Sequence, residues 1–128
     1  MRVLVDTHAL LWMLRDSPEL SPRAREVAAD LSNEILFSIA SAWEIALKHA
    51  LGKLNLGMPY RPFIDGAVKA ARLSLLPISV EHLSHVASLP QHHRDPFDRL
   101  LVAQAIAEGV PLLSRDERLD AYGITRIW

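Results

Sequence analysis

The sequence contains no cysteine, which excludes disulfide bonds and thiolate-ligated metal sites. It also has no uninterrupted apolar stretch that approaches the length of about 20 residues needed to span a bilayer. The first residues place one Arg before apolar residues, but Asp6 and His8 interrupt that run and no small-residue cleavage site follows. We therefore expect a soluble, cytoplasmic protein with no membrane association.

An excess of one charge is absent as well. The formal net charge of −1 gives no whole-molecule attraction to nucleic acid. Any binding of RNA or DNA would have to rely on local basic patches or on bridging metal cations. There is also no GxSxG elbow, P-loop or GxGxxG motif, and His8 stands where a DxD phosphotransferase would place its second acid.

The composition is that of a globular chain. Half of the 128 residues are apolar and 23% are charged. This composition and length predict that residues 1–128 form one domain, which can bury a core without disulfide bonds or structural metals. Short apolar strands alternate with helices, which predicts an α/β fold whose parallel sheet is covered on both faces. The expected strands are 2–5, 35–37, 75–78, 110–114 and 125–127, and the expected helices are 7–15, 22–31, 38–51, 61–73, 79–88, 96–108 and 117–121.

Four acids stand where they could meet at one edge of this sheet. Asp6 follows the first strand and Asp116 follows the fourth, so both can lie at the carboxyl edge, where open α/β sheets bind ligands. Glu44 is set into an apolar helix, and Asp98 is the third residue of another. Each also has a purely structural interpretation: a helix cap or turn for Asp6 and Asp116, a favourable helix-start charge for Asp98, and a Glu44–Lys48 pair on a solvated edge.

Taken together, the four acids indicate a metal site. Carboxylates gathered within several ångströms repel one another, and a cation relieves that repulsion. All-oxygen ligation suits Mg²⁺ or Mn²⁺, either of which can activate water for hydrolysis of a phosphodiester. Histidines at positions 82, 85, 92 and 93 match no familiar zinc motif, so we interpret them as ordinary surface residues.

The motifs VLVDTHALLWML, SAWEIALKHALGKLNL and RDPFDRLLVAQAIAEGVPLLSRDERLDAYG occur in this order over nearly the whole chain. In this order they resemble the motifs of PIN-domain nucleases, especially the VapC-type toxins of toxin–antitoxin pairs. The resemblance implies a PIN-like three-layer α/β/α sandwich with a short central parallel sheet. It matches the acids of the family's metal site to Asp6, Glu44, Asp98 and Asp116, and the hydroxyl residues beside that site to Thr7 and Ser114. Asp95, in the same stretch as Asp98, we assign to helix capping.

The same resemblance implies an Mg²⁺- or Mn²⁺-dependent endoribonuclease that forms a homodimer and is inhibited by a cognate antitoxin protein. The nearly all-apolar first helix, which contains Trp12, agrees with a partner because it needs a covering surface. Arg94, Arg99 and Arg115 neighbour the acids and are candidates for contacts with the RNA backbone. Two alternatives stay open: a catalytically silent PIN-like module that binds protein or RNA, and a metal-dependent phosphatase or DNA nuclease.

Overall fold

A computed structural model describes residues 1–128 and contains a five-stranded sheet with the order β3-β2-β1-β4-β5. The strands are β1 (Arg2–Val5), β2 (Glu34–Ser38), β3 (Leu73–Leu76), β4 (Leu112–Leu113) and β5 (Arg126–Ile127). Every pairing is parallel. The strand order changes direction between β1 and β4, and the carboxyl end of such a switch point is where this kind of sheet forms its ligand crevice.

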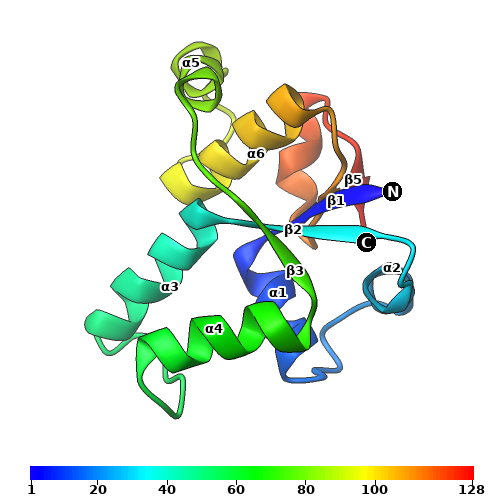
Figure 1. Cartoon of the computed structure of the whole chain (residues 1–128). Coiled ribbons are helices and arrows are strands. Elements are labelled where there is room, and N and C mark those ends of the chain that lie inside the picture. The colour runs from blue at the N-terminus through cyan, green and yellow to red at the C-terminus, as the bar shows by residue number, and fades with distance from the viewer.

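Helices cover both faces of the sheet, as the sequence predicted. They are α1 (Thr7–Leu14), α2 (Pro22–Ala29), α3 (Ile39–Ala50), α4 (Tyr60–Ala70), α5 (Val80–Ser88), α6 (Pro96–Glu108) and the 3₁₀ helix η1 (Glu117–Tyr122). In Figure 1, α1, α2 and α4 lie on one side of the strands, whereas α5 and α6 lie on the other. None of these helices is both long and apolar enough to cross a membrane.

The central strands supply side chains to two separate cores. Val3 and Val5 belong to the cluster shared with α1 and α2, while Leu4, between them, belongs to the cluster shared with α6. All three are fully buried. Because successive side chains of a strand point to opposite faces, an unbroken apolar run such as Val3 to Val5 is expected where both faces are covered.

Two element boundaries show how local signals acted. The predicted start and end of α6 are confirmed: Pro96 is its first residue and Gly109, with φ of 64°, ends it. The predicted third strand, 75–78, was placed two residues too late. Arg72 adopts a left-handed φ of 53°, so the chain leaves α4 before Leu73 and pairing ends at Leu76, just before Pro77.

The apolar first helix is covered mainly by the chain itself. Ala9, Leu10 and Leu11 are buried, and Trp12 packs against Trp128 with ring centroids 5.7 Å apart. The exposed apolar row lies instead on α3, where Ile39, Trp43 and Leu47 are 39%, 54% and 40% exposed. A surface available to a partner is therefore present on α3 rather than on α1.

Candidate metal centre

Asp6 ends β1 and begins α1. Its backbone is extended, and its Oδ1 accepts a hydrogen bond of 2.7 Å from the amide of Ala9. The carboxylate is buried, with a residue exposure of 6%. The capping interpretation of Asp6 is thus correct, and the cap also holds one carboxylate at the switch point of the sheet.

Asp95 and Asp98 have different roles at the start of α6. Oδ1 of Asp95 accepts hydrogen bonds from the amides of Phe97 and Asp98, at 2.8 and 3.3 Å, which confirms Asp95 as the cap. Since Asp95 satisfies these helix-start amides, the Asp98 carboxylate is left to face the cleft at the carboxyl edge of the sheet.

Asp116 is fixed by hydrogen bonds from several donors. Its carboxylate accepts hydrogen bonds from the Arg118 amide at 3.0 Å and from the Arg118 guanidinium at 2.9 Å. Its own amide donates to the buried Ser114 hydroxyl over 3.1 Å. Ser114 follows β4, and its side chain partly offsets the rise that burial causes in the pKa of Asp6, so one hydroxyl lies close to two of the predicted site acids.

His93 joins the same group of residues, although the sequence interpretation treated it as an ordinary surface histidine; that interpretation was wrong. Its side chain is only 7% exposed, and its Nε2 lies 3.0 Å from Asp116 and 3.5 Å from Asp98. Its Nδ1 accepts the amide hydrogen of Asp95 at 3.1 Å. A neutral ring that accepts at Nδ1 carries its proton at Nε2, so His93 donates to Asp116 and is not a metal ligand in this tautomer.

Glu44 is buried, with 2% exposure, and its Oε2 receives a hydrogen bond of 2.5 Å from the Lys48 ammonium. The expected Glu44–Lys48 pair therefore exists, but the expectation of a solvated edge was wrong. Nearby, the Thr7 hydroxyl donates to Ser41 at 2.9 Å, which ties the start of α1 to α3. Glu44 does not line the cleft that the other three site acids share.

That cleft, which we call the acidic cleft, has a volume of about 780 Å³. Five acids line it: Asp6, Asp95, Asp98, Asp116 and Glu117. Three arginines also line it: Arg115, Arg118 and Arg126. Each of them is paired with an acid, namely Glu19, Asp116 and Asp120 respectively. Asp6 and Asp98, by contrast, form no ion pair with a lysine or an arginine.

The pKa values of the acids reflect this arrangement. Burial, followed by the negative charges of Asp95 and Asp6, raises the pKa of Asp98 to about 7. Burial likewise raises the pKa of Asp6. Hydrogen bonds from Arg118 lower the pKa of Asp116 to about 2. Near neutral pH, the metal-free cluster is therefore stabilised either by a proton on Asp98 or by a cation bound in place of that proton.

The donor set fits a hard divalent cation. Asp6, Asp98 and Asp116 offer carboxylate oxygens only, which is the ligation that Mg²⁺ and Mn²⁺ prefer. Burial and the neighbouring negative charges raise the pKa of Asp6 and Asp98, so a bound cation would stabilise their charged forms. The buried Glu44 adds further negative charge, which contributes to raising the pKa of both Asp6 and Asp98.

Other residues singled out in the sequence have different surroundings. Arg99 is buried and donates to the Pro90 carbonyl at 2.8 Å and to the Tyr122 hydroxyl at 3.2 Å, so the expectation that it contacts RNA was wrong. Arg94 is exposed, and Arg115 lies over the Trp12 ring at 5.7 Å.

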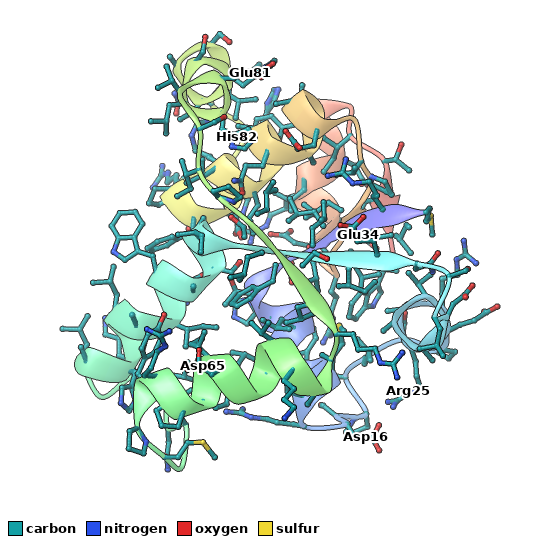
Figure 2. All side chains as sticks on the ribbon, in the orientation of Figure 1. Asp16, Arg25, Glu34, Asp65, Glu81 and His82 are labelled. Atoms are coloured by element: carbon teal, nitrogen blue, oxygen red, sulfur yellow. The ribbon has the colours of Figure 1, made fainter.

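His82 is also no surface residue. It is 3% exposed, and its Nε2 lies 3.1 Å from Glu108. Its Nδ1 accepts the Ser79 amide at 3.0 Å, which completes a capping box at the start of α5. Figure 2 shows His82 on the side of α5 that faces α6, with Glu81 on the outer side. His82 is therefore a structural residue, remote from the acidic cleft.

The sheet order, the two helical layers and the acidic cleft at the switch point define a three-layer α/β/α protein with a candidate metal centre. A family model described as the PIN domain matches residues 3–124. The chain therefore belongs to the PIN domain family.

Named relatives and solved structures agree with this assignment. Ribonuclease VapC22 of Mycobacterium tuberculosis is 28% identical over 120 residues, which are 94% of this chain and 91% of that protein. Ribonuclease VapC16 of the same organism is 40% identical over 63 residues, but this match spans only 49% of the chain and 43% of that ribonuclease.

Among solved structures, VapBC2 from Rickettsia felis, bound to a DNA fragment from its promoter, has a TM-score of 0.73 at 15% identity. It covers 98% of this chain and 97% of its own. VapBC-5 from Mycobacterium tuberculosis, a member of a family of toxin–antitoxin systems, has a TM-score of 0.58 at 14% identity over 94% and 89% of the two chains. At such identities these structures support the fold.

Proposed function

We propose that this PIN-domain protein is a metal-dependent endoribonuclease and the toxin component of a toxin–antitoxin pair. The observation that carries the proposal is the convergence of Asp6, Asp98 and Asp116 on one cleft at the switch point of the sheet. The similarity to ribonuclease VapC22 over 94% of the chain supports RNA as the substrate.

In this proposal Asp6, Asp98 and Asp116 hold the cation, which is Mg²⁺ or Mn²⁺. The buried Glu44 adds negative charge near Asp6 and Asp98. When bound, that cation supplies an activated water and stabilises the charge that develops on the phosphate. The chain's own residues set the geometry. The Ala9 amide fixes Asp6, the Arg118 guanidinium fixes Asp116, and Asp95 caps the helix that carries Asp98.

The hydroxyl residues act as positioning groups in this proposal. Ser114 accepts the amide hydrogen of Asp116 and lies close to Asp6, so it helps to orient both carboxylates. Thr7 donates to Ser41 one turn before Glu44, which fixes the start of α1 against α3. Neither hydroxyl needs to contact the substrate to affect the rate, since orientation of metal ligands alone changes metal affinity.

We also infer a homodimer and inhibition by a cognate antitoxin protein. The exposed apolar row on α3, made of Ile39, Trp43 and Leu47, supports an interface because monomeric proteins rarely expose such a contiguous patch. The likeness to VapBC-5, a toxin–antitoxin system, supports the antitoxin. Light scattering on the chain alone, and after co-expression with the reading frame beside its gene, measures both associations.

Calorimetric titration with Mn²⁺ tests the metal centre without requiring knowledge of the RNA target. We expect saturable binding by the partner-free protein and its loss in Asp98→Asn, because the substitution removes a ligand charge while keeping the shape of the side chain. The variant should also lose RNA cleavage while staying folded, and its metal-free form should melt at a higher temperature because repulsion is removed.

Two results would contradict this reading. Failure of the intact protein to bind Mn²⁺ would favour the catalytically silent binding module. A large loss of thermal stability in Asp98→Asn would instead assign Asp98 to the helix start alone. Cleavage of RNA compared with DNA and with small phosphoesters separates the ribonuclease from a DNA nuclease or phosphatase.

A further inference from the structure

A second hollow, of about 290 Å³, opens beside the acidic cleft and carries the opposite charge. It lies between α1 and α3 and includes residues of the loop that follows α3; the two helices are neighbours in Figure 1. We call it the basic cleft. Its cations are Arg15, Lys48 and Lys53, and the apolar side chains of its floor are Leu11, Ile45 and Leu54.

Two of the three cations of the basic cleft, Arg15 and Lys53, carry charge that the protein does not neutralise locally, whereas Lys48 is paired with Glu44. No acid is among the residues that line this hollow. The only hydrogen bond of the Arg15 side chain is a 3.3 Å contact with the neutral Asn55 carbonyl, and Lys53 forms no ion pair. The arginines of the acidic cleft, by contrast, are all paired with acids. The basic cleft is thus a site for an anion supplied from outside.

The two clefts are neighbours. His8 and Trp12 line both, and the Lys48 ammonium that faces the basic cleft lies 2.5 Å from the buried carboxylate of Glu44. A polyanion with one charge at the acidic cleft can therefore reach the basic cleft by passing His8 and Trp12. We favour RNA over an acidic peptide because, in the proposed function, the cation held by the acidic cleft already binds a phosphodiester of RNA, and the neighbouring backbone phosphates lie next to it along the same strand.

We propose that the basic cleft binds a backbone phosphate of single-stranded RNA adjacent to the phosphodiester that is cut, with the apolar floor beneath the nucleoside. This inference rests on the proposed function, since it names where the substrate of the same site continues. It accounts for how a chain of net charge −1 can attract RNA, through a local cluster of cations rather than through its overall charge.

RNA binding measured against salt concentration tests the basic cleft. The probe is a fluorescein-labelled single-stranded RNA of mixed sequence, followed by anisotropy with Ca²⁺ in place of Mg²⁺ or Mn²⁺, and a gel verifies that the RNA stays uncut. The test variant is Arg15→Ala with Lys53→Ala. The matched control is Arg23→Ala with Lys69→Ala, which removes two exposed, unpaired cations from α2 and α4 and so makes the same change in net charge.

We expect the cleft variant to bind roughly 5-fold more weakly per lost contact near 0.1 M salt, with a salt slope smaller by about 0.7 per contact. The control should stay close to the parent protein. Equal affinities and slopes for the two double variants would overturn the proposal, as would absence of RNA binding by the parent protein at the lowest salt. All four positions are exposed surface cations, and thermal melting verifies that each variant is folded.

Two further arms distinguish the possible failures. Mn²⁺ calorimetry on the cleft variant should match the parent protein. If the parent binds no Mn²⁺ while the cleft variant still loses RNA affinity, the nuclease proposal fails and the basic cleft remains. A peptide of alternating Glu and Leu whose binding depends on Arg15 and Lys53, with RNA binding that does not, would make the cleft a protein-docking surface and refute RNA as its ligand.

Discussion

At the residue scale, His93 connects two of the site carboxylates to the start of α6. Its ring accepts the Asp95 amide at Nδ1 and donates to Asp116 from Nε2, over 3.1 and 3.0 Å. It is therefore a positioning residue: it holds Asp116 in one orientation and spans the 3.5 Å to Asp98. Such outer contacts to metal ligands are typically worth 10- to 100-fold in metal affinity.

Two substitutions separate the two nitrogens of His93. Asn places an acceptor near the Nδ1 position and Gln places a donor near the Nε2 position, so His93→Asn loses the contact with Asp116 and His93→Gln keeps it. We expect Mn²⁺ affinity to fall by roughly 10- to 100-fold in the Asn variant and much less in the Gln variant, measured by calorimetry.

The pair of variants also excludes a general loss of structure. If the Gln variant lost as much Mn²⁺ affinity as the Asn variant, the imidazole itself would be required, as a metal ligand would be. If neither lost affinity, while both melted at lower temperature, His93 would be a structural residue only.

At the element scale, the placement of Asp98 depends on how α6 begins. Asp95 satisfies the amides of Phe97 and Asp98, and Pro96 fits the first helical position. We expect Asp95→Ala to destabilise the protein by about 1 kcal/mol through loss of the cap, and to weaken Mn²⁺ binding because the first turn of α6 frays.

Ser21→Ala is the matched control for this element. Ser21 caps α2 through the Ala24 amide at 3.0 Å, and α2 is remote from the acidic cleft. It should cost a similar free energy of unfolding and leave Mn²⁺ affinity unchanged. Equal metal affinities for both cap variants would show that the start of α6 does not position Asp98.

At the scale of the whole molecule, the acids determine how global stability depends on pH. Asp98 has a folded pKa of about 7 against an ordinary value of 3.8, so between these values the native state holds a proton that the unfolded chain has released. In metal-free buffer, the free energy of unfolding should fall as pH rises from about 4 to 7, by up to about 1.4 kcal/mol per pH unit.

Asp116 has the opposite effect at lower pH. Its pKa of about 2 lies below 3.8, so its contribution is lost as pH falls from about 4 to 2. Urea titrations across pH, in the parent protein and in Asp98→Asn, measure both effects. The variant should show a smaller decline above pH 4, with the remaining part due to Asp6, whose pKa is also raised; an unchanged decline would assign it to groups other than Asp98.

Much of the fold was predictable because its signals are local. The apolar run Val3 to Val5, the Asp95-Pro96 start of α6 and its Gly109 end each act within a few residues. The position of Asp6 at the end of a buried strand followed from the same pattern. Where two local signals competed, as at Arg72, the predicted strand was shifted, because a left-handed residue ended α4 earlier than the apolar pattern indicated.

The sequence alone predicted the alternation of strands and helices and placed acids at the ends of β1 and β4. It could do so because hydrophobic periodicity and helix caps depend on neighbouring residues. Only the tertiary structure decided which polar residues are buried and with whom. His93 meets Asp116 across 23 positions, and His82 meets Glu108 across 26. The basic cleft likewise exists only where α1 packs on α3, since Arg15 comes from the end of α1, whereas Lys48 and Lys53 come from the last turn of α3 and the loop after it.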